Sequence, residues 1–261
     1  MKTKEKTMNR IVVITGATSG LGKAFLESYI KQGDQVVAVG RNREKCQQIQ
    51  KEIGEKTEVQ FCVVDLEKEK AEIEIYEFVK QRYGRIDILI NNAGFGMVEE
   101  YLDGDMQVQD AMIKVNIVAV NRFSYLFGNM MKKQKSGLII NIASTGAYHP
   151  GPYTAEYYAT KAYVASFSEA LQIELEKYGV QVVSVCPGAL ATEFSKKAGR
   201  KENPFAMSPQ RVIRSTLLGI RRRKAVVVPG IFYKVFIRIP RNIGKKLIGR
   251  QQKNMALNID K

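Results

Sequence analysis

Residues 11–22 read Ile11-Val12-Val13-Ile14-Thr15-Gly16-Ala17-Thr18-Ser19-Gly20-Leu21-Gly22. The apolar, β-branched run predicts a buried strand, and the glycine-rich segment after it predicts a tight turn into a helix. Glycines can take positive φ and let an anion approach the backbone N–H groups at a helix N-terminus. The stretch therefore indicates either a phosphate-binding turn or an ordinary strand-to-helix turn.

Further β-branched runs follow along the chain. Together with residues 10–15, the predicted strands are 35–39, 59–64, 86–90, 137–142, 180–186 and 225–228. Between them lie amphipathic stretches with helical spacing, among them 21–31, 68–82 and 156–177. This alternation predicts an α/β fold of the doubly wound Rossmann type, with a seven-stranded, mostly parallel sheet and helices on both faces.

Length and composition fit a single globular domain. The 261 residues are 45% hydrophobic and 26% charged, which disfavours disordered, collagen-like and membrane-bundle proteins. No linker or internal repeat divides the chain, so we predict an N-terminal tail at 1–9, one domain at 10–230 and a basic C-terminal extension at 231–261. The three cysteines lack paired spacing, and no run of 18 apolar residues occurs. We therefore expect a cytoplasmic protein without a disulfide framework, a metal site or a membrane-spanning helix.

Positive charge is concentrated towards the C-terminus. The formal net charge is +15, and residues 196–261 contain 18 Lys and Arg against two acids, which gives this part +16 and residues 1–195 a charge of −1. Such a field attracts nucleic acid, an anionic membrane or an acidic protein. We expect no nucleic-acid binding, because no recognition motif accompanies the charge.

The second and third predicted strands end in residues suited to a nucleotide. Gly40 and Arg41 follow residues 35–39, where a dinucleotide-binding fold meets the adenosine ribose. The planar cation of Arg41 suits a 2′-phosphate, unless this side chain is a solvated surface charge. Asp65, after the third strand, is either an acceptor for an adenine amino group or the N-cap of the next helix.

Tyr157 and Lys161 lie four residues apart on the helix predicted at 156–177. Residues at this spacing share one face, with a rise of about 6 Å, so both side chains can point into one cleft. An ammonium group beside a phenol, whose ordinary pKa is about 10, favours the ionised form. The two residues are therefore either a proton shuttle or an amphipathic surface pair. Ser144 precedes them, just beyond the fifth predicted strand.

Taken together, these motifs resemble the short-chain dehydrogenase/reductase family. The resemblance rests on T-G-x-x-x-G-x-G at 15–22, N-N-A-G at 91–94, Asn116, Ser144, Y-x-x-x-K at 157–161 and Pro187-Gly188 with Thr192. It covers the chain from about residue 10 to residue 192. It implies an NAD(P)-dependent oxidoreductase that forms a homodimer or homotetramer.

The resemblance also implies roles for individual residues. Tyr157 would be the catalytic acid/base, and Ser144 would hydrogen-bond the substrate oxygen. Lys161 would bind the nicotinamide ribose and lower the pKa of the phenol, while Asn116 would hold a water in the proton relay. The residues implied to bind the cofactor are Gly16, Ser19, Gly20, Leu21, Gly22, Arg41, Asp65, Leu66, Asn92, Tyr157, Lys161, Pro187, Gly188 and Thr192.

The expected cofactor is NADP(H), with NAD(H) as the alternative. Some family members that use NADP carry a basic residue in the glycine turn, where this chain has Ser19. The preference therefore rests on Arg41, with help from Asn42 and Arg43. We expect hydride transfer between the nicotinamide and the carbonyl or secondary alcohol of a lipophilic small molecule. The alternative is a cofactor-sensing binding protein whose basic tail holds an anionic partner, but a sensor needs no proton relay.

The segments 146–153 and 189–207 are expected to set substrate choice. The second is either a mobile lid or an ordinary loop. His149, the only histidine, is interpreted as structural. A helix is predicted to start after Ser208 and to end near residues 221–224.

Residues 231–250 mix apolar and basic side chains. We rank three interpretations of this stretch: first a wall of the substrate pocket or an oligomer interface, then a peripheral contact with an anionic membrane, and last a solvated tail.

Overall fold

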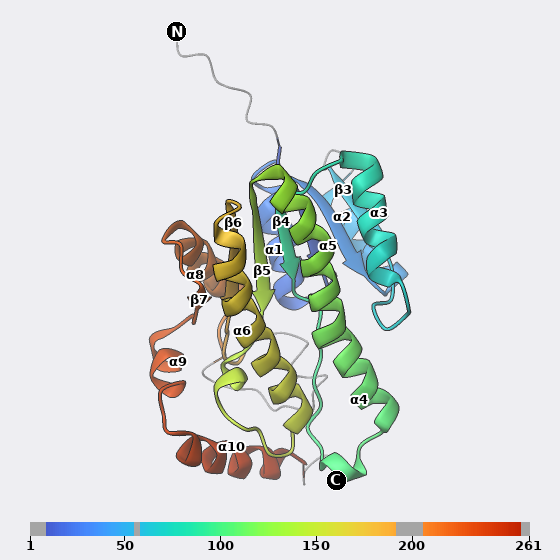
Figure 1. The fold of residues 1–261 in the computed structure, drawn as a ribbon. Coiled ribbons are helices and arrows are strands. Elements are labelled where there is room, and N and C mark those ends of the chain that lie inside the picture. Colours follow the sequence, from blue (N-terminus) through green and yellow to red (C-terminus); the bar gives the residue numbers. More distant parts are fainter. Residues whose placement is uncertain (1–8, 55–57, 192–205, 257–261) are drawn as a thin grey trace.

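The computed structural model describes residues 9–54, 58–191 and 206–256. Its centre is a seven-stranded sheet in the order β3-β2-β1-β4-β5-β6-β7, and every neighbouring pair is parallel (Figure 1). The strands are β1 (Ile11–Thr15), β2 (Gln35–Gly40), β3 (Val59–Val63), β4 (Ile88–Asn91), β5 (Gly137–Ile142), β6 (Val180–Val185) and β7 (Val226–Val227). The seven predicted strands and the doubly wound fold are thereby confirmed.

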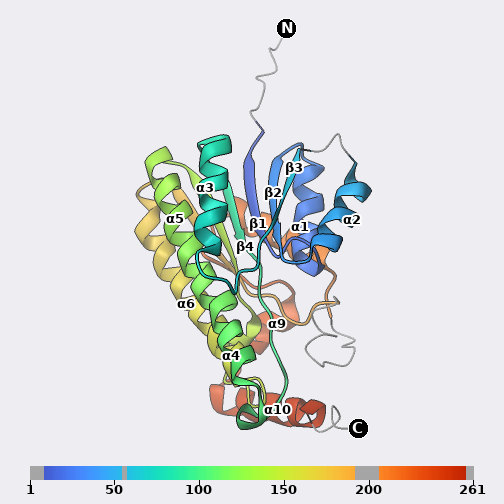
Figure 2. The same ribbon diagram turned by 90° about the vertical axis from the view of Figure 1, so that its right-hand side faces the viewer.

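Helices cover both faces of this sheet, as Figures 1 and 2 show. The described helices are α1 (Gly20–Ile30), α2 (Arg43–Ile53), α3 (Ala71–Tyr83), α4 (Met106–Ile113), α5 (Ala119–Gln134), α6 (Ala155–Glu176), α8 (Pro209–Arg221), α9 (Ile231–Phe236) and α10 (Arg241–Ala256). Three short helical turns are η1 (Tyr101–Asp103), η2 (Lys114–Val118) and η3 (Thr145–Tyr148). The predicted helix after Ser208 is confirmed as α8, and the Ser208 side chain caps it by accepting from the N–H of Arg211.

The core consists of two apolar layers, one on each face of the sheet. Phe25 of α1 and Val212 of α8 belong to one layer. Phe123 and Phe127 of α5 belong to the other. The central strands β1 and β4 are buried along their whole length, as expected for a parallel sheet covered on both faces.

Two features of this topology position a site at the carboxyl ends of the strands. The strand order reverses between β1 and β4, and in doubly wound sheets ligands bind in the crevice at such a reversal. The C-terminal helix α10 crosses beyond the carboxyl ends of the strands (Figure 1). Tyr233 of α9 and Ile248 of α10 are buried, so both helices pack onto the body of the molecule. In the described part of the chain, no helix combines the length and apolarity needed to cross a bilayer.

Candidate active site

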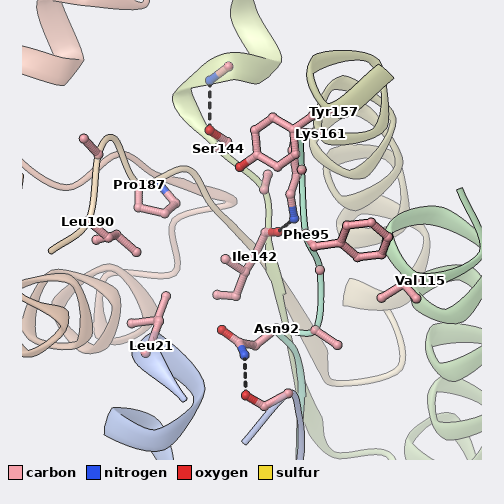
Figure 3. Close-up of a pocket in the computed structure, with 18 of the residues that line it drawn as sticks. Leu21, Asn92, Phe95, Val115, Ile142, Ser144, Tyr157, Lys161, Pro187 and Leu190 are labelled. Carbon is pink, nitrogen blue, oxygen red and sulfur yellow. Dashed lines mark hydrogen bonds between the residues drawn. The ribbon is translucent and has the colours of Figure 1, made fainter. Parts of the chain in front are cut away.

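A cavity of about 1140 Å³ lies at this crevice. It is larger than the roughly 300–1,000 Å³ of ordinary small-molecule sites, so it has room for a dinucleotide together with a substrate. Most predicted site residues line it: Gly16, Ser19, Gly20, Leu21, Arg41, Asp65, Leu66, Asn92, Ser144, Tyr157, Lys161, Pro187 and Gly188 (Figure 3). Of the predicted residues within the described ranges, Gly22, Arg43 and Asn116 are not part of the lining. Thr192 lies outside the described residues.

The glycine turn after β1 brings backbone close to the cavity. Gly16 and Gly20 have φ of +66° and +51°, which favours glycine over other residues. A Cβ on Gly22 would lie 2.1 Å from the carbonyl oxygen of Gly16, so only glycine allows α1 to start this close to the turn. Ser19 is the N-cap of α1, but its side chain makes no capping hydrogen bond. The turn thus offers the first N–H groups of a helix to an anion.

Asn92 joins this turn to the end of β4. Its Nδ2 donates to the carbonyl oxygens of Thr15 (3.0 Å) and Gly16 (3.2 Å), and the second of these bonds is drawn in Figure 3. The Thr15 Oγ1 accepts from the backbone N–H groups of Asn92 and Ala93, each at 3.0 Å. Asn92 therefore both lines the cavity and fixes the glycine turn, a role that the sequence did not reveal.

The nucleotide end of the cavity carries Arg41, whose side chain is 64% exposed. Its Nη1 lies 2.6 Å from Oε1 of Glu67, so the guanidinium is already in an ion pair at the protein surface. Lys45, which the sequence analysis did not single out, lines the cavity one helical turn further on. Arg43, which the sequence analysis did single out, is not part of the lining. The Asn42 side chain caps α2 by accepting from the N–H of Lys45.

Asp65 lines the cavity and does not cap a helix. The N-cap of α3 is Lys70, which lies in the left-handed region with φ of +64°. The Asp65 Oδ1 instead accepts from the N–H of Glu67 at 3.1 Å, a turn that Asp commonly forms. Of the two interpretations left open for Asp65, the N-cap is therefore wrong.

Tyr157 and Lys161 lie in the first two turns of α6 and face the same cavity, as their spacing predicts (Figure 3). They are only 7% and 5% exposed. The Lys161 Nζ donates to the carbonyl oxygen of Ile142 at 2.8 Å and lies 5.9 Å from the centroid of the Tyr157 ring. Burial lowers the pKa of Lys161 to about 8. A Cβ on Gly96 would lie 2.6 Å from Cδ2 of Tyr157, so a glycine is needed where the chain passes the phenol.

Ser144 lies at the end of β5, where it caps η3. Its Oγ accepts from the N–H of Gly146 at 3.0 Å (Figure 3). A hydroxyl both accepts and donates, so this bond leaves its proton for a ligand oxygen in the cavity. The neighbouring Tyr158, which the sequence analysis gave no role, also lines the cavity, and its ring lies against Gly146 and Gly151.

Asn116 lies behind the cavity wall in η2, a π-helical turn between α4 and α5. It is fully buried, and its Oδ1 accepts from the N–H of Phe95 at 3.1 Å. Its Nδ2 donates to the Phe95 carbonyl oxygen and to Oγ1 of Thr160. These bonds hold the segment after β4 against α6, and π-helical turns are frequent at functional sites.

The C-terminal helices form the remaining wall of the cavity, as in the first of the three ranked interpretations. The residues they contribute are Phe232, Tyr233, Phe236, Ile248, Gln251, Gln252, Asn254 and Met255. The Tyr233 hydroxyl accepts from the N–H of Ala189 at 3.1 Å, and a Cβ on Gly188 would lie 2.0 Å from the Tyr233 ring. His149 is buried outside the cavity lining with its Nε2 3.1 Å from the Phe236 carbonyl oxygen, which agrees with a structural role.

Comparison with known proteins identifies the family. A family model described as short chain dehydrogenase matches residues 10–203. An uncharacterized oxidoreductase of Staphylococcus saprophyticus is 35% identical over 189 residues, which are 72% of this chain and 81% of that protein. The chain therefore belongs to the short-chain dehydrogenase/reductase family and is an oxidoreductase.

Solved structures agree with this assignment and hold either form of the cofactor. A short-chain dehydrogenase from Sphingobium yanoikuyae in complex with NADPH has a TM-score of 0.80 at 26% identity, and the match covers 95% of both chains. The 3-ketoacyl-(acyl-carrier-protein) reductase from Brucella melitensis, complexed with NADH, has a TM-score of 0.75 at 26% identity over 85% of this chain and 96% of that one. Similar proteins thus bind NADPH or NADH.

Proposed function

We propose that the protein is an NADP(H)-dependent oxidoreductase that transfers a hydride between nicotinamide and the carbonyl or secondary alcohol of a lipophilic small molecule. The observation that carries this proposal is the pairing of Tyr157 with Lys161, beside Ser144, on the wall of one large cavity. In this proposal residues 10–230 form the catalytic domain and the extension 231–261 completes its substrate pocket.

The residues present fit a nicotinamide dinucleotide. The glycine turn with Ser19, Gly20 and Leu21 would hold the pyrophosphate, because helix N–H groups favour an anion there. Asp65 and Leu66 would lie near the adenine. Pro187, Gly188 and Thr192 would flank the nicotinamide, and Lys161 would bind its ribose. When bound, the cofactor supplies or accepts the hydride.

Proton transfer is assigned to Tyr157. In the direction of reduction the phenol donates its proton to the substrate oxygen as negative charge develops there, and in oxidation the phenolate takes the proton back. Ser144 donates a hydrogen bond to the same oxygen and stabilises that charge. The Lys161 ammonium favours the phenolate form. Asn116 fixes the polypeptide that lies behind the phenol and would bind a water of the proton relay.

The preference for NADP(H) over NAD(H) rests on two cations at the nucleotide end, Arg41 and Lys45. A guanidinium recognises a phosphate in a bidentate manner, and an ammonium adds a second charge. Because the Arg41 side chain is 64% exposed, a 2′-phosphate could reach its guanidinium, where it would replace the Glu67 carboxylate as the partner.

An apolar substrate is proposed because the rest of the wall is mainly apolar. The apolar side chains in question are Phe95, Met97, Leu190, Phe232, Phe236, Ile248 and Met255. The similarity to a 3-ketoacyl-(acyl-carrier-protein) reductase supports a carbonyl on an acyl chain as one substrate class.

The decisive experiment is to follow NADPH and NADH consumption with a panel of medium-chain ketones, aldehydes, cyclic ketones and acyl thioesters. We expect turnover of apolar ketones or ketoacyl thioesters and a higher kcat/KM with NADPH. Absence of turnover across the panel with both nucleotides would contradict the proposed reaction, and a preference for NADH would contradict the cofactor assignment.

We further propose a peripheral contact between the extension and an anionic membrane surface on the cytoplasmic side. Residues 231–256 contain seven Lys and Arg and no acid. Several large apolar side chains on α9 and α10 are exposed: Ile231, Phe232, Val235, Ile243 and Leu247. Such a combination favours adsorption to anionic lipid. Vesicles of phosphatidylglycerol should co-sediment the protein at low salt and less at high salt, whereas no binding at either salt concentration contradicts the contact.

The oligomeric state is proposed to be a homodimer or homotetramer, as the family resemblance implies. Light scattering on the purified protein measures the mass in solution directly. A mass equal to that of one 29.4 kDa chain at micromolar concentration would contradict this proposal.

A further inference from the structure

We infer that Glu67 sets the selectivity for the 2′-phosphate of the cofactor: its carboxylate competes with the phosphate for the Arg41 guanidinium and thereby weakens the preference for NADP(H) over NAD(H). The inference rests on the proposed function, because it assumes that Arg41 meets the 2′-phosphate. It goes further, since it assigns a role to a residue that the sequence did not single out and that is not part of the cavity lining.

The register of the sheet brings Arg41 and Glu67 together. Strands β2 and β3 pair in parallel with Gly40 opposite Val63, and the N–H of Val64 donates to the Gly40 carbonyl oxygen at 3.1 Å. Arg41 and the segment that starts at Val64 therefore leave the carboxyl edge of the sheet side by side. The meeting of the two charged side chains is thus a consequence of strand pairing.

A turn after β3 holds the backbone of Glu67. Its N–H donates to Oδ1 of Asp65 at 3.1 Å, and the N–H of Lys68 donates to the Asp65 carbonyl oxygen at 3.1 Å. Asp65 and Leu66 line the cavity, so Glu67 follows directly on two residues of the nucleotide end. Its side chain is 32% exposed, so most of it is covered by the protein.

The ion pair occupies the group that a 2′-phosphate requires. Nη1 of Arg41 lies 2.6 Å from Oε1 of Glu67, and in the part of the chain that the structure describes Glu67 is the only residue that pairs with Arg41. Carboxylates and phosphates use the same N–H groups of a guanidinium. The carboxylate therefore takes part of the donor set, and its negative charge repels a phosphate that approaches the remaining donors.

NADH and NADPH meet this pair differently. NADH carries a 2′-hydroxyl, which leaves the ion pair in place and the charge of Arg41 neutralised. NADPH must displace the carboxylate or bind beside it, so part of the attraction between Arg41 and the phosphate is lost. Because ion pairs between partly exposed side chains are weak, this loss is modest. The pair thus reduces the preference for NADPH without abolishing it.

The test is the isosteric variant Glu67→Gln, which removes the charge and keeps an oxygen that accepts from Arg41. By titration calorimetry, we expect the Kd for NADPH to fall about fivefold, which corresponds to an exposed ion pair at the upper end of the usual range. The Kd for NADH should change by less than about twofold. A residue that only positioned Arg41 would not tighten NADPH binding when its charge is removed. An unchanged or higher Kd for NADPH in this variant would overturn the inference.

Two comparisons assign the effect to the contact with Arg41. In the Arg41→Ala background the carboxylate has no guanidinium to occupy, so Glu67→Gln should leave the Kd for NADPH nearly unchanged. Glu77→Gln is the matched control, because Glu77 forms an exposed ion pair with Lys80 on α3 and does not line the cavity. It removes the same charge and should leave both Kd values as in the wild type. An equal gain in either comparison would overturn the competition.

Two nucleotide fragments separate this inference from the proposed reaction, because neither contains nicotinamide: adenosine 2′,5′-bisphosphate and adenosine 5′-monophosphate. Glu67→Gln should bind the bisphosphate about fivefold more tightly than the wild type does, and the monophosphate equally. If this difference appears but no carbonyl compound is reduced, the proposed reaction fails and the role of Glu67 stands. If the wild type turns over with a preference for NADPH, but Glu67→Gln binds the bisphosphate no more tightly, the role of Glu67 fails and the proposed function stands.

Discussion

The contact between Gly188 and Tyr233 joins the C-terminal extension to the segment proposed to flank the nicotinamide. The Tyr233 ring lies directly over Gly188, and its hydroxyl accepts from the N–H of Ala189 at 3.1 Å. Tyr233 is only 8% exposed, so the ring has little free space to move into. We therefore predict that Gly188→Ala strongly impairs catalysis, although it adds only one methyl group.

The size of the effect follows from the geometry. The new Cβ would lie 2.0 Å from Cε1 of Tyr233, whereas carbon atoms in contact prefer about 3.5 Å. Either the ring or the backbone at Gly188 must therefore move by about 1.5 Å. A misplacement of about 1 Å at a reacting centre lowers a rate by about 100-fold, and overpacking of this kind destabilises a protein by about 1–3 kcal/mol. We expect kcat to fall about 100-fold and Tm to fall by several degrees.

The assay is steady-state NADPH consumption with the best ketone of the panel, together with thermal unfolding. Gly128→Ala is the matched control, because the nearest atoms to its added Cβ lie at 3.8 Å and it is within α5. This control should keep full turnover and gain about 0.5–1 kcal/mol of stability, since alanine favours a helix interior over glycine.

A double-variant cycle tests the reasoning directly. In the Tyr233→Ala background the obstructing ring is gone, so Gly188→Ala should have no further effect on kcat. If Gly188→Ala lowers kcat equally in both backgrounds, the contact with Tyr233 is not the cause and the reasoning is refuted.

Four further predictions concern the charges and amides of the site. Because burial lowers the pKa of Lys161 to about 8, its ammonium is lost as pH rises through about 8, and turnover should fall there. Lys161→Arg keeps its charge, so the alkaline limb of its pH–rate profile should lie at higher pH than that of the wild type. Alkaline limbs at the same pH in both proteins would contradict this role of Lys161. The same lowered pKa means that the unfolded chain binds this proton more tightly, so the contribution of Lys161 to stability, measured by denaturant unfolding, should increase between about pH 8 and its ordinary pKa of 10.5. Arg41→Ala should raise the KM for NADPH about tenfold and leave that for NADH nearly unchanged in steady-state assays, and equal changes for both nucleotides would argue against a 2′-phosphate contact. Asn116→Ala removes two hydrogen bonds to the partly buried Phe95 and one to the buried Thr160, and it should lower the free energy of unfolding by about 1–3 kcal/mol. An unchanged unfolding midpoint would contradict its role in holding the segment after β4.

The parts of the fold that could be predicted from the sequence are those with a local cause. The strands are mostly β-branched runs, of which the central ones are buried on both faces, and their alternation with helices leaves little choice of topology. Tyr157 and Lys161 could be placed on one side of a helix because a spacing of four residues fixes that geometry. The ambiguity at Asp65 arose because Asp serves equally in turns and at helix starts, and it was resolved only by where α3 begins.

The parts that could not be predicted depend on contacts between distant segments. Residues 188 and 233 are far apart in the sequence, and nothing local to either position shows that a glycine makes room for an aromatic ring. Asn92 was correctly predicted to line the cavity. Its hydrogen bonds to Thr15 and Gly16, however, depend on the register in which β1 pairs with β4. Gln252 is one of two adjacent glutamines, and only the packing of α10 on His149 shows which of them is buried.

The measurement that tests the central assignment most directly is a comparison of Tyr157→Phe with the wild type, with NADPH binding and hydride transfer recorded on the same samples. The substitution removes only the phenolic oxygen, so the cavity and its cofactor wall should be retained. We predict an unchanged Kd for NADPH, measured by its fluorescence, and a loss of at least about 100-fold in the rate of NADPH oxidation by the ketone, which matches the contribution of a general acid. Near-normal oxidation by this variant would contradict the account.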